Sequence, residues 1–283
     1  MIDDSQIAEA LAQYRAEGYA VLRHVFDADE VRDMADAFDR HWAEGMAHGR
    51  SFRHGNLLYR LGRDAKLGKL VRLVQWPSYG DPVLEAVRRD ARHLLILEPL
   101  IGRNVKQIIN QLHWKPPGAA GAEFAFHQDV RFRRPRGAYR NLATSYVQTG
   151  IAIDPHRAGN GAMRIYPRSH LLGEKDLAGP APVLDQSMAD EQLVAAGLDP
   201  AKLVLLELDP GDLALWSVYT IHGSGPNRTK GDRRFYLNGY VRAEDCDRGE
   251  WTFRDRAPCP LGAPVLVHYD DLYARPDPHY LEE

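Results

Sequence analysis

Two residues with metal-binding side chains lie two positions apart in the run 124–132, Phe-Ala-Phe-His-Gln-Asp-Val-Arg-Phe. They are His127 and Asp129. The aromatic and β-branched residues around them favour a β-strand, on which side chains at positions i and i+2 point to the same face. An imidazole and a carboxylate would then converge on one point. This is two thirds of a 2-His-1-carboxylate metal site, the ligand set of non-haem Fe(II) oxygenases.

The best candidate for the third ligand is His222. It closes the apolar run 212–222, which follows a Pro-Gly turn and precedes a Gly-Ser-Gly-Pro-Asn turn. A jelly roll brings the ends of distant strands to one mouth of the barrel, so we expect His222 to meet His127 and Asp129 there.

A His-x-Asp tripeptide alone is weak evidence, because about one is expected by chance in a chain of this composition. A second copy, at residues 268–270, is followed only by His279 in a Pro-rich, polar tail. His127 and Asp129 can also be read as a structural ion pair, and His222 as a buried core histidine.

Length and composition limit the class of protein. The chain has 283 residues and a net charge of −3, so it can bury one large core and gives no reason to expect a nucleic-acid partner. No apolar run approaches the length that spans a membrane, and the polar start MIDDSQIAEA shows no signal peptide. Cys246 and Cys259 are too few for a disulfide scaffold, which favours free thiols and a cytoplasmic location.

The first hundred residues are predicted to be mainly helical with one strand inserted. An apolar repeat at i, i+4 and i+7 predicts an N-terminal helix, and residues 19–26 are typical of a strand. Asp27 and Glu30 resemble a capping box that opens a second helix. Residues 81–98 predict a further helix, which Pro99 would end.

From about residue 104, short β-rich runs alternate with Gly/Pro turns such as KPPGAAG, RAGNG and GSGPNRTKGD. This pattern predicts a double-sheet sandwich or barrel, and a β-rich α+β fold class with helices packed on the β-core. We interpret residues 1–283 as a single catalytic domain. It comprises a mainly helical cover at about 1–103, a jelly-roll core carrying the metal site at about 104–245, and a C-terminal extension at 246–283.

The order of these motifs resembles the phytanoyl-CoA dioxygenase family. His-x-Asp is followed at a distance by HGSGPN, with an arginine eleven residues after its histidine, and EGYAVLRHVFDADEV, HWKPPG and NGAMRIYPRSHLLG are similar too. The resemblance spans about residues 10–240, with one departure at Arg168, where glycine is commoner. It implies a double-stranded β-helix (a cupin-like jelly roll) with N-terminal helices packed on one sheet.

The resemblance also implies the cofactors and the metal ligands. His127, Asp129 and His222 would hold Fe(II), and the reaction would consume 2-oxoglutarate and O2. The resemblance implies hydroxylation of an aliphatic C–H of a small molecule, such as a secondary metabolite or an amino acid, with release of succinate and CO2. The presence of Asp129 favours hydroxylation over halogenation, while desaturation, epoxidation or cyclisation would use the same site. The alternative is a cupin-like metal-dependent hydrolase or isomerase that does not use 2-oxoglutarate.

Three residues are assigned to the cosubstrate. By resemblance, Arg233 would bind the distal carboxylate of 2-oxoglutarate with help from Ser224, and Gln111 is placed in the same site. Arg233 can also be read as a solvated charge at a strand edge, and Ser224 as a simple turn residue.

The remaining candidates are predicted to form walls of a substrate pocket. They are His113, Lys115, Tyr146, Arg131 and Trp216. The first two share a strand face with Gln111, and the two aromatic residues fit core packing as well as a pocket wall. The arginine-rich stretch 131–140 can recognise an anionic substrate, although we favour a solvated loop there.

Overall fold

The structure is a computed structural model that describes residues 2–119, 122–177, 183, 189–265, 267 and 278–281. The second His-x-Asp motif, at 268–270, lies outside the described residues. Within the described ranges, no helix has the length and apolar character needed to cross a membrane.

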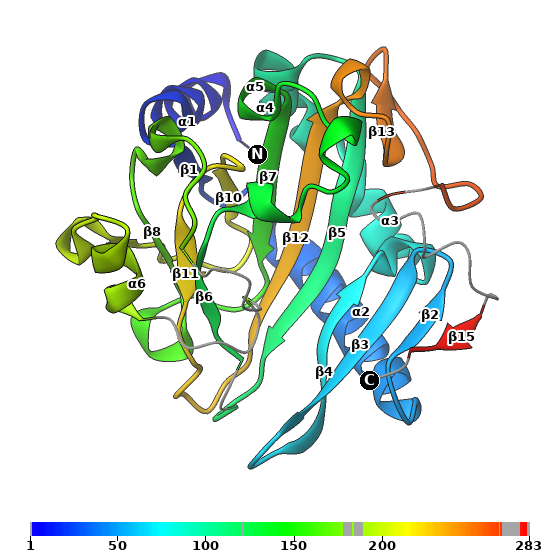
Figure 1. Cartoon of the computed structure of the whole chain (residues 1–283). Helices are drawn as coiled ribbons and strands as arrows, with labels where there is room; N and C mark the ends of the chain where they lie inside the picture. Colours follow the sequence, from blue (N-terminus) through cyan, green and yellow to red (C-terminus); the bar gives the residue numbers. More distant parts are fainter. Residues whose placement is uncertain are drawn as a thin grey trace.

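Two antiparallel β-sheets face each other and form the body of the molecule (Figure 1). The larger sheet has the order β1-β10-β7-β12-β5-β4-β3-β2-β15, with β13 and β14 attached beside β5. Its strands are β1 (Tyr19–Leu22), β2 (Phe52–His54), β3 (Leu57–Asp64), β4 (Gly68–Gln75), β5 (Val105–Lys115), β7 (Tyr146–Ala152), β10 (Leu213–Trp216), β12 (Arg233–Arg242), β13 (Glu250–Arg254), β14 (Ala257–Pro258) and β15 (His279–Tyr280). The smaller sheet has the order β6-β11-β8-β9, from Phe124–His127, His222–Ser224, Met163–Ile165 and Val204–Leu205. The two layers confirm the predicted jelly-roll class, without closure into a barrel.

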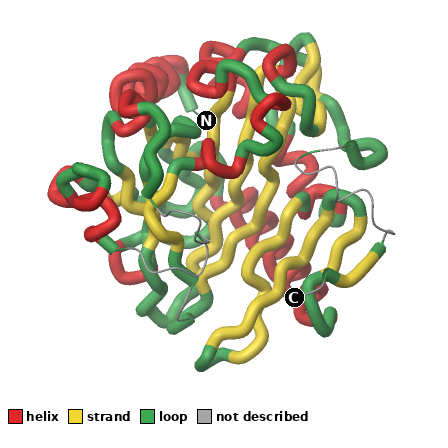
Figure 2. The backbone as a smooth tube through the Cα atoms, viewed as in Figure 1, coloured by secondary structure: helices red, strands yellow, loops and turns green. Residues whose placement is uncertain are grey.

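Helices pack on the outer face of the larger sheet, as predicted (Figures 1 and 2). They are α1 (Asp4–Glu17), α2 (Ala28–Ala47), α3 (Pro82–Arg88) and α4 (Ala91–Ile101), while α5 (Leu142–Ser145) and α6 (Asp190–Ala195) are short. The capping box that opens α2 is present, since Asp27 accepts from the backbone of Glu30 and Glu30 from that of Asp27.

The single helix expected over 81–98 is wrong. The Asp90 carboxylate accepts a hydrogen bond from the backbone N–H of Arg92 and so starts α4 as a separate helix after α3. Pro99 lies inside α4 and does not end it.

The expectation of one strand in the first hundred residues is also wrong, because β2, β3 and β4 follow α2. Strand β4 pairs with β5, with Leu73 opposite His113 and Val74 opposite Leu112. The hairpin β3–β4 thus extends the larger sheet through a pairing with a strand some forty residues further on, which no local pattern in the sequence reveals.

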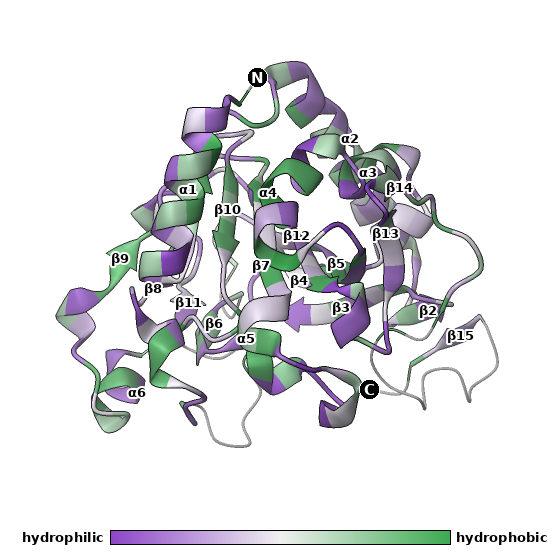
Figure 3. Ribbon diagram, turned by 90° about the horizontal axis from the view of Figure 1, so that it is seen from above, coloured by the Kyte–Doolittle hydropathy of each residue, from purple (hydrophilic) through white to green (hydrophobic). Residues whose placement is uncertain are grey.

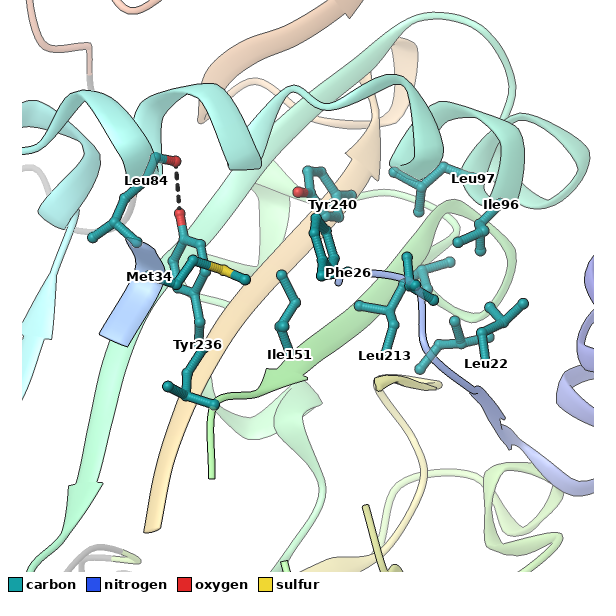
Figure 4. Packing of buried hydrophobic residues seen from close by; sticks show 14 of the residues in the cluster. Leu22, Phe26, Met34, Leu84, Ile96, Leu97, Ile151, Leu213, Tyr236 and Tyr240 are labelled. Atoms are coloured by element: carbon teal, nitrogen blue, oxygen red, sulfur yellow. Dashed lines mark hydrogen bonds between the residues drawn. The ribbon is translucent and has the colours of Figure 1, made fainter. Parts of the chain in front are cut away.

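Side chains along β12 alternate between the helices and the space between the sheets. Tyr236 and Tyr240 point to the helices, where the Tyr236 hydroxyl donates to the Leu84 carbonyl at 3.0 Å (Figure 4). The Tyr240 hydroxyl donates to the Arg88 carbonyl at 2.9 Å. The odd-numbered residues from Arg233 onward therefore point inward. Figure 3 shows mainly apolar residues in β7, β10 and α4, consistent with a core between helices and sheet. Packing of the outer face against the helices fixes the register of β12, and this register places the inward-pointing side chains in the space between the sheets.

We expect acid to weaken this core through His93 on α4. The ring is buried, and burial lowers its pKa to about 4. The unfolded chain binds a proton near pH 6.5 that the folded chain excludes, so the free energy of unfolding should fall by about 2–3 kcal/mol from this residue between pH 7.5 and 4.5. Urea unfolding of wild type and His93→Gln at both pH values checks this; an equal loss in both proteins would contradict it.

Candidate metal centre

Two histidines and an aspartate meet between the sheets. His127 and His222 are paired across β6 and β11 in the smaller sheet. Asp129 Oδ1 lies 3.6 Å from Nε2 of His127 and 3.9 Å from Nε2 of His222. One ligand atom from each of the three residues lies within 4.8 Å of the other two. Two imidazoles and one carboxylate at this spacing can share a single metal ion.

The local structure that brings them together differs from the predicted strands. Strand β6 ends at His127, and Asp129 opens a 3-10 turn that runs to Phe132. The run 212–222 is not one strand either: β10 ends at Trp216 in the larger sheet, and β11 begins at His222 in the smaller one. The convergence therefore comes from a turn and from a crossing between sheets.

Both imidazoles are oriented by backbone carbonyls. Nδ1 of His127 lies 2.8 Å from the carbonyl oxygen of Ala125, and Nδ1 of His222 lies 2.9 Å from that of Thr220. A carbonyl only accepts, so each Nδ1 carries the proton and each Nε2 offers its lone pair to the centre. Burial lowers the pKa of His222 to about 4, which keeps this ring neutral near pH 7.

The carboxylate is held by a tryptophan. Trp216 Nε1 donates to Asp129 Oδ2 at 2.9 Å, which leaves Oδ1 on the side of the histidines. Burial alone would raise the pKa of Asp129, but His222, His127 and Arg133 together lower it well below its usual range. The centre therefore presents one charged carboxylate and, at His222, a neutral imidazole, the protonation states that a metal requires.

A cavity of about 450 Å³ opens beside the three residues. Five residues predicted for the cosubstrate or substrate pocket line it: Gln111, His113, Trp216, Ser224 and Arg233. The Gln111 Oε1 and His113 Nε2 atoms lie 2.9 Å apart, and burial lowers the pKa of His113 to about 3. His113 is therefore a neutral polar group on the cavity wall.

One end of the cavity carries a buried cation without a carboxylate partner among the described residues. Arg233 Nη2 donates to the Gly161 carbonyl at 2.9 Å, and its Nε has no hydrogen-bond partner. Burial lowers the pKa of Arg233 to about 10, so the guanidinium stays charged at neutral pH. Arg234 points to the opposite face and pairs with Asp154 at 2.9 Å. Arg233 is thus buried, and it forms no ion pair with any residue that the structure describes.

Three of the predicted pocket residues lie outside the cavity lining. Lys115 Nζ donates to Ser224 Oγ at 2.7 Å and to the Gly225 carbonyl, and Lys115 does not line the cavity. Tyr146 is fully buried behind the wall, and Arg131 lines a separate pocket on the other side of His127. None of these three side chains therefore forms part of the cavity wall as predicted.

Several lining residues were not predicted from the sequence, and Arg133 is the most informative of them. It lies in the stretch 131–140 that we favoured as a solvated loop, but its side chain is only 1% exposed. Arg60 and Gln148 also line the cavity, from β3 and β7. Nothing in the local sequence distinguishes Arg133 from its exposed neighbour Arg136.

The part of the chain that carries the three clustered residues is similar to a known protein family. The family model described as phytanoyl-CoA dioxygenase (PhyH) matches residues 14–235, which include both histidines and the aspartate. The chain belongs to the phytanoyl-CoA dioxygenase family.

Related proteins support the same family. The chain is 29% identical over 243 residues to a probable alpha-ketoglutarate-dependent hypophosphite dioxygenase of Stutzerimonas stutzeri, covering 84% of this chain and 79% of the relative. It is 26% identical to a 2-aminoethylphosphonate dioxygenase of the uncultured bacterium HF130_AEPn_1, covering 88% and 86%.

Solved structures share the fold. EctD from S. alaskensis with bound Fe superposes with a TM-score of 0.66 at 20% identity, covering 95% of this chain and 89% of that one. The epimerase SnoN in complex with Fe3+, alpha ketoglutarate and nogalamycin RO gives a TM-score of 0.59 at 22% identity, covering 95% and 98%. These matches confirm the predicted jelly-roll fold with its helical cover.

Proposed function

We propose that this family member is an Fe(II)- and 2-oxoglutarate-dependent dioxygenase that hydroxylates an aliphatic C–H of a small molecule. The observation that carries the proposal is the convergence of His127, Asp129 and His222 beside a cavity that is also lined by the cation Arg233, which has no carboxylate partner in the described part of the chain. In the reaction, one oxygen atom of O2 enters the product alcohol and the other enters succinate, while 2-oxoglutarate loses CO2. Family membership and the names of the relatives support this class of chemistry.

The donor set fits iron. Two histidines and one carboxylate with remaining positions open are typical of non-haem Fe(II) oxygenases. His127 and His222 would bind through Nε2 and Asp129 through Oδ1, because the other ring nitrogens and Oδ2 are already hydrogen-bonded. When bound, the iron supplies dioxygen activation. The protein supplies fixed ligands in the correct protonation state.

The cation end of the cavity fits 2-oxoglutarate. Arg233 would bind its distal carboxylate, since a buried guanidinium with free N–H groups pairs strongly with a planar anion. Ser224 and Gln111 line the same cavity and can add hydroxyl and amide contacts. Lys115 Nζ donates to Ser224 Oγ and so orients that serine.

The cavity walls limit the prime substrate, the molecule that is hydroxylated. A volume of about 450 Å³ is within the range of small-ligand pockets. Apolar side chains such as Leu73, Phe235 and Leu237 line it and keep water away from the reacting groups. The substrate is therefore a small molecule. The free thiols Cys246 and Cys259 favour a cytoplasmic location.

We expect Trp216→Phe to weaken Fe(II) binding about 10- to 100-fold, because it removes the N–H that orients the Asp129 carboxylate. Anaerobic equilibrium dialysis measures this without reference to turnover. Trp251→Phe is the matched control, since Trp251 lies on β13 outside the cavity. Equal Fe(II) affinity in wild type and Trp216→Phe would show that the indole does not act on the metal.

The proposal is tested by succinate formation from 2-oxoglutarate under air, with and without Fe(II). Iron-dependent succinate establishes the class even before the prime substrate is known. Tight binding of iron and 2-oxoglutarate without succinate indicates an enzyme that requires its substrate first. Failure to bind 2-oxoglutarate would defeat the proposal and favour the metal-dependent hydrolase or isomerase. That alternative is not favoured, because it leaves the buried charge of Arg233 without a role.

A further inference from the structure

A second buried guanidinium belongs to the cavity wall. Arg133 is 1% exposed and lines the cavity, and it makes one hydrogen bond, from Nη2 to the Tyr146 hydroxyl at 2.8 Å. Its Nε and Nη1 have no hydrogen-bond partner within the described parts of the chain, and no carboxylate there forms an ion pair with it. An arginine cannot lose its proton at neutral pH, so it stays charged. Buried N–H donors without acceptors are costly, which makes Arg133 a candidate for binding a group that is absent from the free protein.

The partners of Arg133 place it away from the cosubstrate end. Its guanidinium lies over the Tyr146 ring, 4.8 Å from the centroid, and the Tyr146 hydroxyl donates to Gln148. The Tyr146 hydroxyl lies directly against Gly239 on β12, because a Cβ added to this glycine would come within 2.1 Å of it. Gly239 is six residues along β12 from Arg233, roughly 20 Å in an extended strand. The two guanidinium groups therefore mark separate regions of one cavity.

The side chains that line the cavity carry more positive than negative charge, and binding of Fe(II) and 2-oxoglutarate does not neutralise this excess. Among the described residues that line the cavity, Arg60, Arg133 and Arg233 are cationic, and Asp129 supplies the one carboxylate. Fe(II) and the 2-oxoglutarate dianion cancel each other in net charge. Two positive charges then remain, one of them on Arg60 at the exposed rim, where it can attract an anion from solution.

We propose that the prime substrate carries an anionic group, a carboxylate or a phosphorus oxyanion, which Arg133 binds in the half of the cavity beside Tyr146 and Gln148. This inference rests on the proposed function, because it assigns Arg233 to the cosubstrate. Arg133 is then a specificity-determining residue: it selects small acids over neutral molecules of the same shape. Its unused N–H groups are satisfied only in the substrate complex.

The test uses the Fe(II)-loaded full chain without dioxygen, with and without 2-oxoglutarate. The probes are propionate, ethylphosphonate and the neutral propionamide, at equal ionic strength set with potassium chloride. Binding is followed by calorimetry and by the midpoint of thermal unfolding, in wild type, Arg133→Met and Arg136→Met. Arg136 is the matched control because it is exposed and paired with Glu174.

We expect at least one of the two anions, but not propionamide, to raise the wild-type midpoint by a few degrees. Arg133→Met should weaken that anion about 10- to 100-fold, with 2-oxoglutarate affinity unchanged within about twofold. Whether propionate or ethylphosphonate binds shows whether the anionic group of the substrate is a carboxylate or a phosphorus oxyanion.

Three results would overturn the inference: equal anion binding by wild type and Arg133→Met, equal binding of propionamide, or loss of 2-oxoglutarate affinity on replacing Arg133. If Arg133→Met fails to fold, Arg133→Lys replaces it; the lysine keeps the charge but loses the planar fork, so anion binding must fall. Failure of the proposed function is a separate outcome, since wild type would then bind no 2-oxoglutarate, while the arm without 2-oxoglutarate still tests Arg133.

Discussion

Replacing Asp129 with alanine is expected to abolish succinate formation and to lower Fe(II) affinity more than about 100-fold. Loss of a residue that only hydrogen-bonds a metal ligand already lowers metal affinity about 10- to 100-fold, and loss of the ligand itself should cost more. Asp129 is the sole charged ligand of the three clustered residues. Its loss leaves two imidazoles, which do not balance the charge of the ion. Succinate assays and anaerobic metal titration measure the two effects.

The fold should survive this change, since a cluster of polar groups between the sheets contributes little to the apolar core. Circular dichroism and the unfolding midpoint check that point. Asp247→Ala is the matched control, because Asp247 is exposed and paired with Arg140 far from the cavity. Full succinate formation by Asp129→Ala would refute the metal assignment.

The second large effect is expected from Arg233→Gln. Removing one partner of a buried charge pair costs about 2–4 kcal/mol, which is roughly a 30- to 1000-fold higher requirement for 2-oxoglutarate. The rate at saturating 2-oxoglutarate should change much less, because the residue binds the end of the molecule remote from the reacting bonds. Titration of 2-oxoglutarate by calorimetry gives its affinity directly.

Arg234→Gln is the internal control for this experiment. Arg234 follows Arg233 in β12 but points to the opposite face, where it bonds Asp154 and Asp39. The Arg234→Gln variant should have a lower free energy of unfolding and an unchanged 2-oxoglutarate affinity. If Arg233→Gln behaves in the same way, the carboxylate anchor lies elsewhere in the cavity.

Much of the site followed from the sequence because its signals are local. His127 and Asp129 are neighbours, and Ser224 follows His222 within the same short segment. The fold class followed from the alternation of short β-rich runs and turns after residue 104, and the α2 capping box from two residues three positions apart.

What the sequence missed depends on contacts between distant segments. Strand β4 is recognisable only through its pairing with β5, and the crossing from Trp216 to His222 only through the presence of two sheets. Arg133 and Arg136 stand in the same arginine-rich stretch, and packing against Tyr146 on β7 is what buries one and not the other. Burial of a charged side chain is a tertiary property, and local composition predicts the opposite.

The carboxylate of Asp129 joins the two layers of the molecule. Its Oδ2 receives the indole N–H from β10 of the larger sheet, while its Oδ1 faces histidines on β6 and β11 of the smaller one. The spacing between the layers is therefore coupled to the ligand geometry through this carboxylate. Because the same layers bound the cavity, a molecule that fills it and moves one sheet against the other also adjusts the metal centre.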